Sequence, residues 1–146
     1  MNMSKRTKIS QAVTTTNGAA GTTAITGAVL DMSGFESAMV LVTFGAITAG
    51  AVTSIKMQQG DASDLSDATD LAGTGQTIAD TDDDKTFYID LVKPAKRYCR
   101  LYVSRGTQNA VVASATYIQY EGKKVPATHG TNVAGETWQT PDAGTA

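Results

Sequence analysis

The sequence predicts an all-β protein: a single antiparallel β-sandwich, jelly-roll-like, with extended N- and C-terminal arms. Apolar and polar residues alternate with a period of two in several segments, as in strands that bury one face. Gly, Asp and Asn separate these segments, and no segment longer than two turns keeps a helical stripe. Many short strands with such punctuation favour an antiparallel sandwich or barrel, and the jelly roll is our first choice among these.

The alternation predicts eight strands. The five strongest are residues 36–45, 51–59, 86–91, 97–104 and 110–120, and the three weaker ones are residues 11–16, 24–30 and 67–72. Both faces of the segment 36–45 are fairly apolar, which favours a central position in a sheet. The turn-like Thr48-Ala49-Gly50 predicts that this segment forms a hairpin with the next one. In the segment 97–104 the alternation turns Cys99 inward, where we expect a small buried hydrophobic residue and not a nucleophile.

Both ends of the chain are expected to be arms around a sandwich domain of residues 11–124. The N-terminal arm, residues 1–10, carries Lys5, Arg6 and Lys8 and has no apolar run of the kind found in secretory signals. The C-terminal arm, residues 125–146, loses the alternation and is rich in Thr, Ala and Gly. A large apolar side chain in such an arm, Trp138, is expected to dock on another surface of the same chain or of a neighbour.

The composition argues against several functions. The 12 Lys and Arg residues face 14 Asp and Glu residues, so there is no basic excess to hold nucleic acid. No apolar stretch reaches the length of about 18 residues that spans a membrane. One Cys and one His exclude an intrachain disulfide and zinc-type clusters. We therefore expect a soluble protein without a cofactor. We also expect no enzymatic activity, because any catalytic triad would need the single His129, which we interpret as a free tail residue.

Two acidic zones stand apart from the strands, and they contain Asp61, Asp64, Asp67, Asp70 and Asp80, Asp82, Asp83, Asp84. The spacing of Asp80, Asp82 and Asp84 matches the first ligand positions of a helix-loop-helix calcium site. The match then ends, since Lys85 stands at the required glycine and Leu91 at the bidentate glutamate. We interpret both zones as solvated loops, with calcium binding left as an alternative.

A basic cluster brackets the segment 97–104, and it comprises Lys93, Lys96, Arg97, Arg100 and Arg105. Tyr98 and Tyr102 share the outward face of this segment with Arg100, an arrangement that could stack nucleic-acid bases. The negative net charge favours a different interpretation, in which Arg100 pairs with neighbouring carboxylates or covers an interface with its stem.

The order of several motifs resembles a family of small proteins encoded in the structural gene clusters of tailed phages. The motifs are Ser-Gly-Phe-Glu-Ser-Ala at 33–38, Phe-Gly-Ala-Ile-Thr at 44–48, the segment 55–64, Ala-Asp at 79–80, the segment 85–90, Lys-Arg-Tyr-Cys-Arg-Leu-Tyr-Val at 96–103, and the segment 110–120. Together they cover residues 34–122. The chain departs from the family pattern at Cys99, where an aliphatic residue is usual, and in its C-terminal extension.

The resemblance implies a head decoration, or cement, protein with a jelly-roll-like sandwich and terminal arms that reach over coat subunits. Its expected partners are the major capsid protein and itself, as a homotrimer by preference or a dimer. Its expected location is the outer surface of the capsid of the virion, after assembly in the host cytoplasm. Lys5, Arg6 and Lys8 are then expected to bind acidic coat surface, and Trp138 to anchor the other arm.

The alternative is a tail-associated or carbohydrate-binding β-sandwich module. It would need exposed aromatic residues around an acidic loop, for instance Tyr88, Tyr98 or Tyr102.

Overall fold

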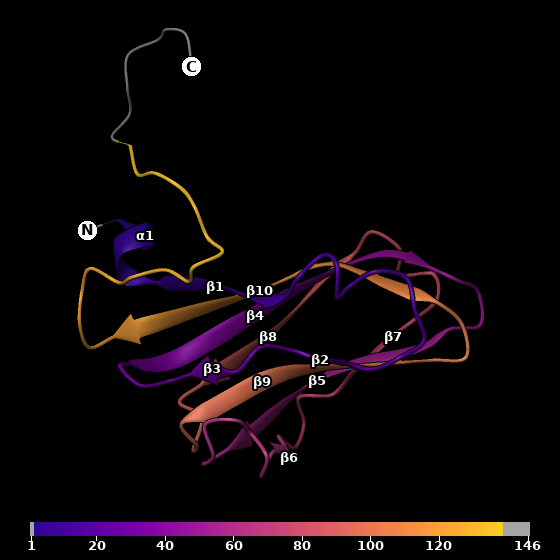
Figure 1. The fold of residues 1–146 in the computed structure, drawn as a ribbon, viewed down its shortest axis with the longest axis horizontal. Coiled ribbons are helices and arrows are strands. Elements are labelled where there is room, and N and C mark those ends of the chain that lie inside the picture. Colours follow the sequence, from indigo (N-terminus) through magenta and orange to yellow (C-terminus); the bar gives the residue numbers. More distant parts are fainter. Residues whose placement is uncertain (1, 139–146) are drawn as a thin grey trace, which may run out of the picture.

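The computed structural model describes residues 2–138, which form two antiparallel sheets packed face to face (Figure 1). The elements in chain order are α1 (Met3–Arg6), β1 (Lys8–Val13), β2 (Ile25–Thr26), β3 (Leu30–Asp31), β4 (Phe35–Ile47), β5 (Val52–Gly60), β6 (Thr69–Asp70), β7 (Gln76–Ile78), β8 (Thr86–Val92), β9 (Tyr98–Gly106) and β10 (Ala110–Gly122). Within the described residues, no helix is both long enough and apolar enough to cross a membrane.

The strand order is that of a jelly roll. One sheet has the order β1-β10-β4-β8, and the other has β9 next to β5, with β2 and β3 beyond β9 and with β6 and β7 beyond β5. The pairs are therefore nested: the first strand pairs with the last, β2 and β3 with β9, β4 with β8, and β5 with the strands that follow it. The expected antiparallel jelly-roll sandwich is confirmed.

The expected hairpin between residues 36–45 and 51–59 is wrong. β4 lies in the first sheet and β5 in the second, so the turn after Ile47 carries the chain across the sandwich. Both hydrogen-bonding edges of β4 are occupied, by β10 and β8, which confirms its central position and leaves no edge for β5. A period of two shows which face of a strand is buried and carries no information about which strand lies beside it.

The weak segments differ most from expectation. The segment 24–30 is divided between β2 and β3, the segment 67–72 contains only the two-residue β6, and β7 and α1 were not expected. β1 begins at Lys8, so the last residues of the expected N-terminal arm belong to the sandwich. β2, β3, β6 and β7 each pair with β9 or β5 at only two or three register positions.

The core lies between the two inner faces. Phe44 and Tyr117 from the first sheet and Ile55, Met57 and Leu101 from the second are fully buried. Cys99 is also fully buried on the inner face of β9, as the alternation predicts. Because the thiolate would lose its hydration there, burial raises the pKa of the Cys99 thiol to about 11, and the residue acts as a small hydrophobic side chain.

Candidate interaction surface

The N-terminal segment and the segment after β10 lie side by side next to β1, at one end of the sandwich (Figure 1). The amide of Ala127 donates to the carbonyl oxygen of Lys5 at 2.8 Å, and the amide of Gly130 donates to that of Ile9 at 2.8 Å. Further along, the hydroxyls of Ser4 and Thr137 lie 2.6 Å apart. We call residues 3–9 together with residues 125–138 the terminal clasp. It occupies the outward amide and carbonyl of Ile9 on the outer edge of β1, which would otherwise be open to other chains.

His129 belongs to the terminal clasp, and its interpretation as a free tail residue is wrong. The amide of Ile9 donates to Nδ1 of His129 at 3.1 Å, and the side chain is half-buried. The contact requires an imidazole whose Nδ1 is an acceptor. The sequence offered no signal for this pairing, because the two residues are 120 positions apart.

The structure brings together three of the four residues predicted to contact a partner. Lys5 and Arg6 are exposed on α1, and Trp138, which is 73% exposed, follows the residue that bonds to α1. Lys8 differs from them in burial: it is half-buried in β1, opposite the fully buried Gln119 of β10. Two exposed apolar side chains of the terminal clasp, Met3 and Val125, were not singled out from the sequence.

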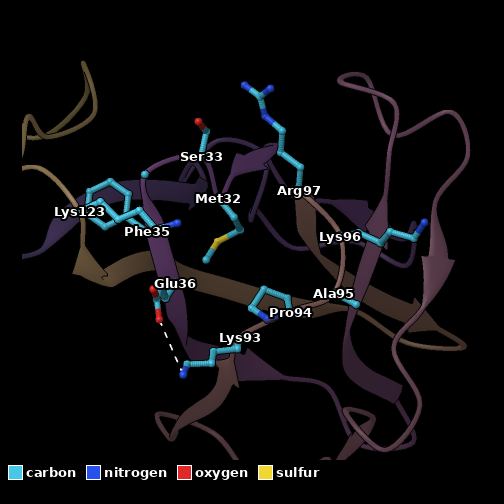
Figure 2. Close-up of a pocket in the computed structure, with 11 residues that line it drawn as sticks. Met32, Ser33, Phe35, Glu36, Lys93, Pro94, Ala95, Lys96, Arg97 and Lys123 are labelled. Atoms are coloured by element: carbon cyan, nitrogen blue, oxygen red, sulfur yellow. Dashed lines mark ion pairs between the residues drawn. The ribbon is translucent and has the colours of Figure 1, made fainter.

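A shallow hollow of about 580 Å³ lies at the same end of the sandwich, between the β3–β4 and β8–β9 loops (Figure 2). Met32, Phe35 and Pro94 supply its apolar lining, and Lys93, Lys96, Arg97 and Lys123 its positive charge. Figure 2 shows Lys93 and Glu36 directed toward each other, with Nζ 3.8 Å from Oε2, whereas Lys96 and Arg97 point outward.

The outward-pointing cations of the hollow are already paired. Nε and Nη2 of Arg97 donate to the two carboxylate oxygens of Asp31 at 2.9 Å, and Lys96 pairs with Asp61. Arg97 accordingly holds the pKa of the Asp31 carboxyl below its usual value, and Asp61 raises the pKa of Lys96. The hollow therefore offers an anion less positive charge than its composition suggests.

The other two arginines of the basic cluster also bond within the chain. Nε of Arg100 donates to the side-chain oxygen of Gln58 at 2.8 Å, so the carboxylate partner expected for Arg100 is replaced by an amide. Arg105 donates to the backbone carbonyls of Ala19, Thr23 and Ala110 and holds the β1–β2 loop against β9.

The acidic zones shape the loops in which they lie. Asp67 accepts hydrogen bonds from the amides of Asp61 and Ala62, which closes the loop after β5. Asp83 and Asp80 accept from the amides of Ile47 and Gly50, which ties the β7–β8 loop to the turn after β4. Between residues 2 and 138, no group of three or more His, Cys, Asp or Glu side chains is placed to hold a metal ion. These contacts favour the interpretation of the zones as loops.

The aromatic residues do not gather around an acidic loop. The ammonium of Lys56 lies 5.1 Å from the ring centre of Tyr102, and the guanidinium of Arg97 lies 5.0 Å from that of Tyr98. Tyr88 is 63% exposed, but it stands on the opposite sheet. Cations therefore occupy the rings of Tyr98 and Tyr102, and the three tyrosines named from the sequence do not share one face of the sandwich.

Comparison with known proteins bears on the fold. No family model and no curated protein matches the chain. Among solved structures, it is similar to the SPBc2 prophage-derived protein YomS, with a TM-score of 0.50 and 12% sequence identity over 77% of this chain and 91% of that one. At this identity the likeness shows a shared fold.

Proposed function

We propose that the protein is a structural component of a tailed-phage particle, and specifically a head decoration protein that binds the outer capsid surface and bridges major capsid protein subunits. Three observations support the proposal. The jelly roll is a common architecture of viral capsid domains. The fold is shared with a prophage-derived protein. The motifs of residues 34–122 follow the order seen in the decoration-protein family.

The terminal clasp carries the proposal. It exposes Met3, Val125 and Trp138 as well as the cations Lys5 and Arg6, and the Ser4–Thr137 hydrogen bond joins the segment that precedes Trp138 to the helix that carries the cations. Exposed aromatic side chains, Met and Arg are enriched at protein contact surfaces. We infer that Trp138 anchors the clasp in a pocket of the coat and that Lys5 and Arg6 pair with coat carboxylates.

Symmetry supplies the strength of binding in this proposal. A homotrimer or dimer presents several identical clasps, so individually weak contacts act together to resist the outward pressure of packaged DNA. The role requires no catalysis, no cofactor and no contact with nucleic acid or membrane. The protein's place would be the outside of the capsid, after assembly in the host cytoplasm.

Co-sedimentation with expanded heads that lack decoration protein tests the proposal. Trp138→Ala is expected to lower the affinity for heads by roughly tenfold or more, as loss of a buried aromatic anchor does. The double variant Lys5→Gln/Arg6→Gln should weaken binding chiefly at low salt. Val52→Ala, a truncation of another exposed apolar residue at the far end of the sandwich, serves as the control and should bind normally.

The single Trp of the chain also provides a direct signal. Trp138 is exposed in the free protein, so its fluorescence should shift to shorter wavelength and become protected from quenchers when heads are added. Equal binding by wild type and Trp138→Ala, with no spectral change, would reject the clasp as the contact surface. Binding to glycans without binding to heads would instead support the carbohydrate-binding alternative.

A further inference from the structure

The four edges of the two sheets are protected very unequally. The terminal clasp bonds to the β1 edge at Ile9, through the amide of Gly130 and Nδ1 of His129. In the other sheet, the outer strands β2, β3, β6 and β7 are only two or three residues long. β8 is a seven-residue edge strand. Long, uncovered edges pair readily with further strands, and natural proteins rarely leave them open without a use.

The backbone of β8 is directed outward at alternate residues. The amide of Phe44 donates to the carbonyl oxygen of Lys85 at 3.0 Å, which places Lys85 and each second residue after it in hydrogen-bonded pairs with β4. Thr86, Tyr88, Asp90 and Val92 therefore direct their amides and carbonyls away from the sheet. The carbonyl of Tyr88 accepts a hydrogen bond from Nε2 of Gln76 at 2.8 Å. The other outward groups have no partner within residues 2–138.

We propose that β8 pairs antiparallel with β8 of a second copy of this chain, so that two four-stranded sheets join into one eight-stranded sheet across a two-fold axis. When the two strands overlap along their full length, Ile89 lies at the axis. Tyr88 is then opposite Asp90 of the second copy, and Thr86 is opposite Val92. Each outward residue exchanges both of its backbone hydrogen bonds in this register.

The charges of β8 favour this register over the neighbouring one. Asp90 is the one charged residue of the strand, and full overlap places it opposite a tyrosine. A shift of one residue in each strand would set Asp90 opposite Asp90, which is unfavourable. The flanking lysines, Lys85 and Lys93, approach each other at the ends of the paired strands. Each already has a carboxylate within its own copy, at 2.6 Å and 3.8 Å, so their repulsion is reduced.

The exposed side chains of β8 gain partners as well. Tyr88 and Val92 are 63% and 67% exposed in the single chain, although both belong to types that strands favour when half-buried. Pairing sets Val92 against the methyl group of Thr86 and Tyr88 alongside Asp90 of the second copy. Gln76 has to release the carbonyl of Tyr88, and a backbone amide of the second copy takes its place.

Sedimentation equilibrium of the free protein, over a range of concentrations and without capsids, tests the pairing and its register. Wild type is expected to be a dimer. Tyr88→Lys sets a cation opposite Asp90 and should keep the dimer. Tyr88→Glu sets a carboxylate there, twice per dimer, and should raise the dissociation constant roughly tenfold. Ala113→Glu, which adds the same charge at an exposed site on the central strand β10, should leave it unchanged.

Tyr88→Pro provides a second test. It removes one outward amide that β4 does not use, a change that edge strands tolerate, and it should give a monomer. Circular dichroism and melting of each variant confirm that the fold is kept; if Tyr88→Pro does not fold, the Lys and Glu variants decide. A monomeric or trimeric wild type overturns the pairing, and equal effects of Lys and Glu overturn the register. These outcomes do not depend on capsid binding, so this inference and the proposed function can fail separately.

Discussion

Replacing Tyr117 by Phe should destabilise the protein far more than the loss of one oxygen atom suggests. The hydroxyl of Tyr117, on β10, crosses the core to the other sheet. It accepts a hydrogen bond from the amide of Leu101 at 2.7 Å and donates to the carbonyl of Ala28 at 2.8 Å. Leu101 lies between the residues of β9 that pair with β2 and those that pair with β3. The hydroxyl therefore bonds to the edge of β9 in the gap between its pairing with β2 and its pairing with β3.

The cost follows from what each group can do without the hydroxyl. The amide of Leu101 is buried and would have no acceptor, which costs about 1–3 kcal/mol. Ala28 is an exposed residue, so its carbonyl can bond to water and loses roughly 0.5–1 kcal/mol. The phenyl ring itself stays in place. We expect Tyr117→Phe to lower the free energy of unfolding by about 1.5–4 kcal/mol, with a melting temperature lower by roughly 2–4 °C for each kcal/mol.

Urea denaturation followed by circular dichroism measures this loss. Tyr120→Phe is the matched control: the same atom is removed, but that hydroxyl bonds to Asp90 at 2.6 Å in an exposed position, where water replaces it. Its effect should be within about 0.5 kcal/mol. Equal stability losses in the two variants would refute the role assigned to the buried hydroxyl.

Three further predictions concern a glycine packed against the backbone, the buried Cys99 thiol and the terminal clasp. Gly18→Ala should lower the free energy of unfolding by about 1–3 kcal/mol, because the added Cβ would lie 2.0 Å from the carbonyl oxygen of Val112. Gly75→Ala, which has open space around it, should be nearly neutral in the same urea assay. The pKa of the buried Cys99 thiol is about 11, against an ordinary value of 9.0 for a solvated thiol. The unfolded chain therefore loses this proton first, and the free energy of unfolding falls as the pH rises between these two pKa values. Cys99→Ala should flatten that decline, and an unchanged slope would contradict the prediction. His129→Ala removes the acceptor of the Ile9 amide and should speed hydrogen exchange there without changing the urea midpoint of the sandwich; unaltered exchange would show that the clasp does not depend on this contact.

Part of the candidate surface was visible in the sequence. Trp138 stood out as a large apolar residue in a polar segment, and Lys5 and Arg6 as cations at the other end of the chain. Their proximity was not visible, because it depends on hydrogen bonds between residues 4 and 137 and between residues 5 and 127. The ion pairs of the basic cluster could not be predicted for the same reason. The sequence showed the cations, and only the fold showed that Asp31 and Asp61 lie against Arg97 and Lys96.

The sequence alone determined the class of fold and, in the segments 86–91 and 97–104, the buried face, because alternation is a local property of consecutive side chains. Cys99 and Leu101, for example, could be assigned to the core from their own segment. Tertiary structure decided which strands are neighbours: β4 and β5 follow each other in the chain and face each other across the core instead of pairing. It also decided that the clasp bonds to the β1 edge while β8 stays open. Such choices depend on packing between segments distant in the sequence, where the identity of a residue specifies its burial but not its partner.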